Sequence, residues 1–350
     1  MESLIHKRSV ADSSILGANI SHGLTVCRCE NKEEWNDFVR RSPQGTIYST
    51  TEFMEAIGLQ PELWIVKNNG RPGLGAVVLK ESGRLIRAPF PFTMYQGVLA
   101  TPDYDSMPPH SRFPLLMRMT DSLLVILEQN YSSISLCFHH STVDLRSFSW
   151  FHYHQPELGR FEIILHYTGL LDLAGLTNFD EYVAGIRELR RRDRRKAEAL
   201  EYTIEESSDV EGLNRLHGLT LDRQGLQRTA HEQHVLIRIA QFALEQRMGT
   251  LLACRDREGK IVAMTLFLYD HRCGYYCIGA NDPEHRNGGA GTYLMLENIR
   301  LCWKRGCRFV DFVGVNSPNR GDYKISFNAV PTPYYVAAWQ KPCPGKNGQG

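Results

Sequence analysis

Residues 275–315 read YYCIGANDPEHRNGGAGTYLMLENIRLCWKRGCRFVDFVGV, and this stretch decides the fold. It opens with a strand-like run that ends near Asn281, passes through a glycine-rich turn, and continues as a helical pattern that stops at Gly306. The short apolar run CRFVDFVGV follows and is typical of a buried strand. At the end of an antiparallel meander, a strand, a helix and a second strand in this order predict a mixed sheet.

The segments before this stretch complete the sheet and repeat its plan. Strands are predicted at TLLACRD, KIVAMTLFLYD and CGYYCIGAN, and helices over residues 178–200, 208–222 and 231–248. The first half has a similar order, with helices over 31–41, 51–57 and 113–129 and strands at LWIVKNN, GLGAVVLKE, GRLIRAP, SSISLCF and FEIILHY. The predicted fold class is α/β (α+β), with two similar modules, each a mixed, mostly antiparallel sheet flanked by helices, that meet near residues 167–175.

Composition limits the class of protein. A chain of 350 residues, 42% of them hydrophobic, is long enough for two domains with real cores. The formal net charge of +1 excludes a uniformly basic nucleic-acid coat protein, although not a local basic patch. No apolar run approaches the roughly 18 residues of a membrane helix, and no secretory signal is recognisable. Nine scattered cysteines without a CxxC pair indicate reduced thiols, so we expect a cytoplasmic protein without a metal site.

The glycine-rich turn is the sharpest local motif. A strand-to-helix turn that contains Gly288, Gly289 and Gly291 can present unpaired backbone N–H groups to a phosphate, and the helix dipole favours an anion there. Arg286 could bind the same anion in a bidentate manner. The pattern R-x-x-G-x-G resembles the pyrophosphate loop of GNAT acyltransferases, which bind acyl-CoA at this turn. The alternative is a plain tight turn.

Two further elements supply candidate catalytic residues. In GVNSPNRGDYKISFNA, residues 314–329, the turn signals SPN and RGD are expected to deliver Lys324 to the mouth of a cleft, where its ammonium could hold a phosphate or stabilise an oxyanion. Tyr275 and Tyr276 precede the glycine-rich turn, and only one of them can face a given pocket because neighbours on a strand alternate. Asp311 is a candidate base, although a buried strand aspartate is as often structural. The simpler interpretations are that Lys324 is a surface residue and that Tyr275 and Tyr276 belong to the core of the sheet.

Basic side chains form the third candidate group. The helical pattern over 178–200 carries a dense set of arginines, and Arg191 and Arg194 share a stripe with Arg187. This stripe could bind the phosphates of RNA or of a nucleotide-linked substrate, or it could be a solvated helix face. We also assign Arg223 and Asn316 as candidate substrate-binding residues.

The joint order of several blocks resembles a known family. The blocks are EWNDFVRRSPQGTIYSTTEFMEAIG, DLRSFSWFHYHQ, IRELRRRDRRKAEALEYTIEE, LHGLTLDRQGL, GKIVAMTLFLYD, residues 275–315 and DYKISFNAVPTPYYV. Together they span about residues 31–338 and resemble the FemABX-type aminoacyltransferases and the BioF2-like acetyltransferases, which are tandem GNAT-fold proteins. The resemblance implies an N-terminal arm over 1–24, a first GNAT-like module over 25–168 for acceptor binding or scaffolding, a catalytic, donor-binding second module over 169–328, and a strand over 329–343 that returns to the first module.

The resemblance also implies an activity. The enzyme would form an amide bond by passing an acyl or aminoacyl group to a primary amine of a small molecule, peptide or cell-envelope precursor. Lys324 matches the functionally important lysine of the family segment F-K-x-x-F-G, and Tyr275 or Tyr276 matches tyrosines of the same channel. Two features differ from the family: Asn328 replaces the usual glycine, and no coiled-coil arm is recognisable.

The acyl donor is left with two alternatives. We expect aminoacyl-tRNA, which the family likeness and the arginine-rich helix favour, and keep acyl-CoA, which R-x-x-G-x-G favours, as the alternative. No tightly bound cofactor is expected in either case. A hypothesis from another class is a non-catalytic module that binds a nucleotide-sugar or a peptide.

Overall fold

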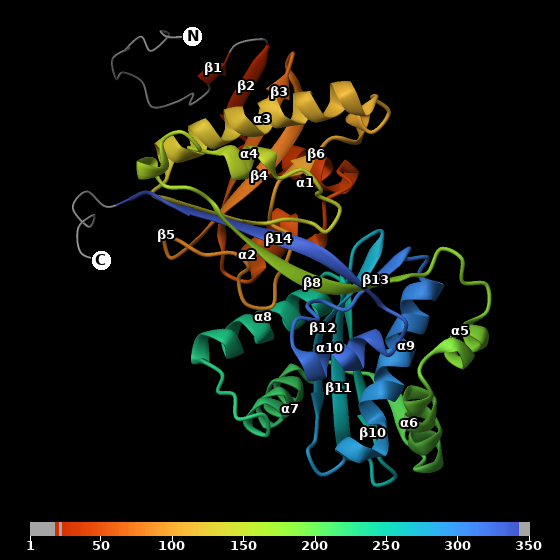
Figure 1. Cartoon of the computed structure of the whole chain (residues 1–350). Helices are drawn as coiled ribbons and strands as arrows, with labels where there is room; N and C mark the ends of the chain where they lie inside the picture. The colour runs from red at the N-terminus through yellow and green to blue at the C-terminus, as the bar shows by residue number, and fades with distance from the viewer. Residues whose placement is uncertain (1–17, 21–22, 343–350) are drawn as a thin grey trace.

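The computed structural model describes residues 18–20 and 23–342, which form two α/β modules one above the other in Figure 1. The predicted fold class is confirmed. Most of the expected N-terminal arm and the last residue of the expected C-terminal strand, residue 343, lie outside the described residues. Among the described residues, no helix combines the length and the apolar character needed to span a membrane.

The first module is built around a six-stranded sheet with the order β1-β2-β3-β4-β5, in which β6 also pairs with β4. The 22-residue helix α3 crosses one face of this sheet (Figure 1). The elements of this half are β1 (Ala18–Ile20), β2 (Leu24–Arg28), α1 (Lys32–Arg41), η1 (Ile47–Ser49), α2 (Thr51–Ala56), β3 (Gln60–Asn68), β4 (Arg71–Glu81), β5 (Arg84–Leu85), β6 (Leu99–Ala100), η2 (Pro102–Tyr104), α3 (Pro109–Asn130), β7 (Ser133–Cys137), α4 (Arg146–Trp150) and η3 (Pro156–Leu158).

The second module is built around an eight-stranded sheet with the order β7-β14-β8-β13-β12-β11-β10-β9. The strand–helix–strand unit predicted from residues 275–315 is present, because β12 and β13 pair in parallel across α9. The elements of this half are β8 (Glu162–Asp172), α5 (Phe179–Gly185), α6 (Glu188–Ala199), β9 (Thr203–Glu206), α7 (Val210–Asp222), α8 (Ala230–Glu245), β10 (Gly249–Arg255), β11 (Ile261–Tyr269), β12 (Cys273–Asn281), η4 (Arg286–Gly288), α9 (Ala290–Lys304), β13 (Phe309–Asp311), α10 (Pro318–Ile325) and β14 (Val330–Gln340).

The two modules share a sheet and a core. The strand β14 pairs with β7 on one side and with β8 on the other, so the long strands β8 and β14 run from one module into the other (Figure 1). Aromatic side chains also pack across the junction, where Tyr48 contacts Tyr275 at 5.1 Å and Phe53 contacts Phe242 at 5.5 Å between ring centroids. One buried cluster contains all four of these rings. The junction is therefore held by burial as well as by strand pairing.

Two local predictions were wrong. The pattern over 178–200 predicted one helix, but Ile186 is extended and 2% exposed, so the chain breaks into α5 and α6 to bury that side chain. The signals SPN and RGD predicted turns, but Ser317 directly precedes α10 and the other residues lie in this helix, where Pro318 occupies the first turn, a position that favours a helix start. Lys324 therefore belongs to the last turn of a helix.

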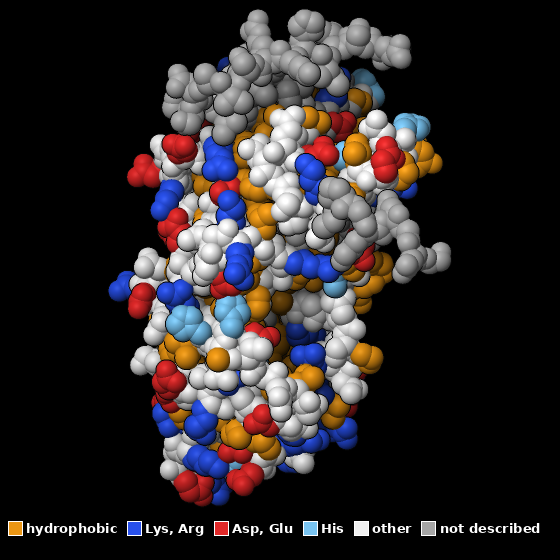
Figure 2. Space-filling model, turned by 90° about the vertical axis from the view of Figure 1, so that its left-hand side faces the viewer, with side chains coloured by type: hydrophobic (Ala, Val, Ile, Leu, Met, Phe, Trp, Pro, Cys, Tyr) orange, Lys and Arg blue, Asp and Glu red, His pale blue; other side chains and the backbone are white. Residues whose placement is uncertain are grey.

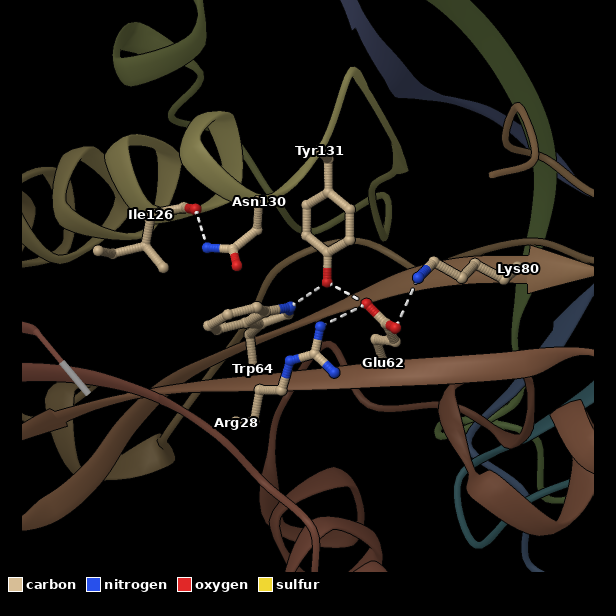
Figure 3. A network of polar contacts seen from close by, with 7 residues as sticks. All are labelled: Arg28, Glu62, Trp64, Lys80, Ile126, Asn130 and Tyr131. Atoms are coloured by element: carbon tan, nitrogen blue, oxygen red, sulfur yellow. Dashed lines mark hydrogen bonds and ion pairs between the residues drawn. The ribbon is translucent and has the colours of Figure 1, made fainter. Parts of the chain in front are cut away.

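A polar network ties α3 to the sheet of the first module (Figure 3). Glu62 of β3 accepts from Arg28 of β2 at 2.9 Å and from Lys80 of β4 at 2.7 Å. The hydroxyl of Tyr131, which follows α3, also donates to Glu62, and it accepts from Trp64 Nε1 at 2.8 Å. Burial raises the pKa of Glu62, but the hydrogen bonds from Lys80 and Tyr131 and the charge of Arg28 outweigh burial, so the net effect lowers this pKa.

We expect Glu62→Gln to reduce the free energy of unfolding by about 1–2 kcal/mol at pH 7, because it removes the charge that three donors share. A carboxylate with a lowered folded pKa stabilises the protein above its unfolded pKa of 4.5 and loses that contribution as the pH falls through the folded pKa. Urea denaturation at pH 7 and at about pH 3 should therefore show the difference between variant and wild type shrinking. Glu55→Gln, at an exposed ion pair with Lys32, is the control. Equal stabilities of wild type and Glu62→Gln at pH 7 would contradict this account.

Candidate active site

A cavity of about 790 Å³ opens in the second module where β12 separates from β13. The parallel pairing of these strands covers only residues 273–275 and 309–311, so the rest of β12 has β11 on one edge and no strand on the other. The cavity occupies that free edge, below the junction with the first module. Its lining consists of Phe92, His217, Thr220, Arg223, Gln224, Leu226, Thr265, Tyr276, Cys277, Ile278, Gly279, Asn281, Gly291, Ser317, Asn319, Arg320, Tyr323 and Lys324.

The charges of the lining all have one sign. Arg223, Arg320 and Lys324 border the cavity, and its lining contains no aspartate or glutamate. Within the described part of the chain, neither arginine forms an ion pair: Arg320 Nε donates to Ser317 Oγ at 3.5 Å, and Arg223 has only backbone contacts. Figure 2 shows that the face carrying α7 and α8 is hollowed near the level of the junction, with Lys and Arg side chains at the edge of the hollow. The lining therefore carries positive charge, which favours an anionic ligand over a cationic one.

Lys324 is partly buried and held at the cavity wall. Its ammonium donates to the carbonyl oxygens of Val313 and Gly314, the latter at 2.9 Å, and lies 5.3 Å from the ring centroid of Tyr276. Burial lowers the pKa of Lys324 to about 8, with the charge of Arg320 acting in the same direction and that of Asp311 against it. An ammonium has three donors, so these carbonyls leave one N–H for a ligand.

The two tyrosines on β12 have different surroundings. Tyr276 lines the cavity, and a Cβ on Gly279 would lie 1.8 Å from its hydroxyl, so the glycine leaves the space that this side chain occupies. Tyr275 is 2% exposed, donates to Asp270 Oδ2 at 2.6 Å and faces the first module. Cys277 is an extra residue in the ladder with β11, because Leu266 pairs with residue 278 and Phe267 with residue 276. Only Tyr276 of the predicted pair reaches the cavity.

The glycine-rich turn touches the cavity through Gly291 alone. Gly289 has φ +86° and starts α9, and the described part of the chain offers no acceptor to the backbone N–H groups of residues 289–292. Gly288 and Gly289 are buried against Tyr202 and Asp193, and Arg286 is exposed outside the lining. The turn therefore offers N–H donors at the edge of the cavity, while three of its four predicted anion-binding residues lie outside the lining.

Asp311 lies outside the cavity lining and is 1% exposed. Its carboxylate accepts from the hydroxyls of Tyr95, at 2.8 Å, and Thr168, and from the backbone N–H of Val313 at 2.8 Å. A carboxylate that is buried with these three donors has no open path to a substrate proton. This geometry argues for a structural role of Asp311 rather than for the predicted base.

The remaining predicted residues also lie outside the lining, apart from Arg223. Arg191 contacts Glu188 at 2.5 Å and the carbonyl oxygen of Ala184, and Arg194 contacts Glu198 at 2.8 Å. The side chain of Asn316 accepts from the backbone N–H of Tyr167 at 2.7 Å and so fastens the loop after β13 to β8. Carboxylates thus engage both arginines of α6 that we assigned to substrate binding.

Sequence reasoning missed most of the lining, and three of the missed residues bear on the chemistry of the cavity. Phe92 comes from the first module and packs its ring 5.8 Å from that of His217. His217 Nδ1 lies 3.2 Å from Arg228 Nη1, and burial, together with the charge of Arg228, lowers the pKa of His217 to about 4. Since the arginine must donate to Nδ1, the proton of this neutral imidazole is on Nε2, which can donate to a ligand. The third residue, Arg320, is in the segment predicted to form a turn.

Comparisons with known proteins agree with this architecture. Residues 184–324 match the family model described as "Acetyltransferase (GNAT) domain". A crystal structure of FemX is similar to this chain, with a TM-score of 0.60 at 13% identity. The match covers 88% of this chain and 96% of the FemX chain. A tandem GNAT protein from the clavulanic acid biosynthesis pathway has a TM-score of 0.53 at 12% identity and covers 92% of this chain and 100% of that chain. No curated protein matches the chain by sequence.

These findings define the class of the protein. The chain has a tandem GNAT fold, and residues 184–324 of its second module match the model of a GNAT-type acetyltransferase domain. The resemblance to FemABX-type proteins and their tandem GNAT relatives is confirmed at the level of the fold. A GNAT domain whose cavity holds a lysine and two unpaired arginines supports an acyltransferase.

Proposed function

We propose that this chain is an N-acyltransferase that binds a phosphorylated acyl donor in the cavity of the second module and transfers the acyl group to a primary amine. One observation carries the proposal: Lys324, Arg223 and Arg320 line a cavity without a carboxylate, and its edge reaches the N-terminus of α9. Positive side chains and free N–H groups favour the phosphates of a donor. The GNAT domain supports acyl transfer as the reaction.

The chemistry follows from the geometry around Lys324. The neutral amine of the acceptor attacks the carbonyl carbon of a thioester or an ester, which forms the C–N bond and places negative charge on the carbonyl oxygen. The third N–H of Lys324 can stabilise that oxygen, a contribution of about 2.7–4 kcal/mol for one well-placed donor. The C–S or C–O bond then breaks, and the leaving thiolate or alkoxide takes the proton that the amine loses. The lining supplies no carboxylate base for this proton, and the lone pair of His217 Nδ1 is used by Arg228.

Acyl-CoA is the donor that the geometry supports best. The free edge of β12 can pair with an extended arm that carries amide groups, such as the pantetheine of CoA. The N-terminus of α9 reaches the cavity at Gly291 and could bind the pyrophosphate of CoA. Aminoacyl-tRNA is the second candidate, because the sequence resembles FemABX-type aminoacyltransferases. The pairing of Arg191 and Arg194 with carboxylates weakens the electrostatic argument for tRNA.

The donor can be tested directly. The purified chain is incubated with a panel of primary amines and with either acetyl-CoA or a mixture of charged tRNAs, and products are identified by intact mass. We expect amide formation from acetyl-CoA that RNase treatment leaves unchanged. If product forms only from charged tRNA and disappears after RNase treatment, the donor is aminoacyl-tRNA and not acyl-CoA. Ligand binding without product from either donor would favour a non-catalytic nucleotide-sugar or peptide module.

A further inference from the structure

We propose that Tyr95, in the first module, is a positioning residue that sets the geometry of Lys324 in the second module through Asp311 and the turn at Val313 and Gly314. The inference rests on the proposed function, because it assigns a partner to the lysine of that site. It also gives the first module a role in the reaction beyond scaffolding.

The first step of this connection is the contact across the junction. The hydroxyl of Tyr95 donates to Asp311 Oδ2 at 2.8 Å, and Tyr95 is 1% exposed. Its own carbonyl oxygen accepts from Ser49 Oγ at 2.7 Å, and its ring packs on Tyr334 of β14 at 5.7 Å. Contacts to its backbone and to its ring therefore hold Tyr95 in the position from which its hydroxyl reaches Asp311. Burial, and then the charge of Asp311, raise the pKa of Tyr95, so its hydroxyl keeps the proton that it donates.

The second step is the turn that follows β13. Val313 has φ +50° and Gly314 has φ +56°, so two consecutive residues are in the left-handed region. A β-branched residue is unfavourable there and needs a compensating contact. Asp311 Oδ1 provides it, because it accepts from the backbone N–H of Val313 at 2.8 Å. The carboxylate thus holds the strained turn in place.

The third step links the turn to the lysine. In this conformation the carbonyl oxygens of Val313 and Gly314 both accept from Lys324 Nζ. They orient two of its three N–H bonds. Because the ammonium is tetrahedral, the direction of the third N–H bond is then fixed as well. If the turn relaxes, the ammonium loses its two acceptors together, because both belong to the same pair of residues.

The groups that face Lys324 determine how its pKa changes when the turn at Val313 and Gly314 relaxes. Asp311 favours the ammonium form, Arg320 disfavours it, and Cys277 and the ring of Tyr276 lie against it as neutral groups. Burial is the largest influence and lowers the pKa of Lys324 to about 8. Relaxation of the turn removes the carbonyl acceptors while burial and Arg320 remain, so the pKa of Lys324 should fall further.

The test is Tyr95→Phe, which keeps the ring and removes only the hydroxyl. We expect kcat to fall roughly tenfold, the scale of one lost hydrogen bond to a charged group, with a much smaller change in KM for the donor. The pKa of Lys324 is measured without turnover, by NMR titration of the ¹³Cε signals of the chain produced with ¹³C-labelled lysine, with the signal assigned from its absence in Lys324→Arg. We expect this pKa to be lower in Tyr95→Phe than in wild type.

Tyr131→Phe is the matched control, because it also removes a tyrosine hydroxyl bonded to a carboxylate in the first module, at Glu62. It should lower stability and leave the titration of Lys324 unchanged. A folded Tyr95→Phe with the wild-type pKa of Lys324 would overturn the inference. Ser49→Ala, which removes the hydrogen bond to the carbonyl oxygen of Tyr95 and keeps the charge of Asp311, should shift that pKa in the same direction and serves as the second variant should Tyr95→Phe not fold. Full activity of Lys324→Ala would exclude the lysine from the reaction and leave the acyltransferase function standing, whereas no amide formation by the wild type from either donor would remove the proposed function. In both cases the NMR result judges the coupling alone.

Discussion

Lys324→Ala is expected to lower kcat/KM for amide formation by about 100-fold or more, with the chain still folded. The substitution removes the donor that the structure holds with the carbonyl oxygens of Val313 and Gly314 at the cavity wall. Steady-state kinetics with the donor that forms product in the mass assay gives the measurement. Lys304→Ala, an exposed lysine in the last turn of α9, is the control and should behave as wild type. Unchanged turnover in Lys324→Ala would exclude this residue from the reaction.

The pH dependence separates two roles for the lysine. Lys324 loses its proton around pH 8, whereas an arginine at this position stays charged. If the ammonium stabilises the oxyanion, the ratio of wild-type to Lys324→Arg activity should fall as the pH rises through about 8. The acceptor amine titrates equally in both reactions, so it cancels in the ratio. A ratio that rises in this range would show that the neutral lysine acts as a base.

Gly289→Ala is expected to have the second large effect, on stability and on donor binding together. Gly289 has φ +86°, and an added Cβ would lie 2.1 Å from the carbonyl oxygen of Asp193 in α6. The substitution therefore forces α6 away from the N-terminus of α9, in addition to straining the backbone. We expect a loss of about 3 kcal/mol in the free energy of unfolding and a rise in KM for the donor. Urea denaturation and donor kinetics measure the two effects.

Gly306→Ala at the other end of α9 is the matched control. Gly306 has φ +76° and no atom within 4 Å of an added Cβ, so this variant has the backbone strain without the collision. It should lose less stability and keep the KM for the donor. Equal behaviour of the two variants would mean that the close approach of α6 has no influence on the turn.

The architecture of the second module could be predicted because its signals are local. Periodicity gives the strands and α9, and glycines mark both ends of that helix. The break between α5 and α6 could not be predicted, since the helical pattern continues through Ile186 and only the packed core shows why this residue must leave the helix.

Residues of the site could be predicted from a pattern only where a single segment of the sequence shows that pattern. Lys324, Tyr276 and Gly291 come from such segments, and the structure brings them to one cavity. The position of Asp311 depends on Tyr95, which is 216 residues away, and no pattern in the sequence reports that contact. Phe92 belongs to the other module and shows no motif of its own. The choice between Tyr275 and Tyr276 likewise depends on which face of β12 the first module covers.

The placement of β14 has a consequence for synthesis of the chain. Val330–Gln340 fills the space between β7 and β8, so both of those strands leave the ribosome long before the strand that separates them. During that interval their edges are open to pairing with each other or with a neighbouring chain. A chain that ends before residue 330 should therefore aggregate rather than fold as a shortened protein, so folding of both modules has to wait for synthesis of this last strand.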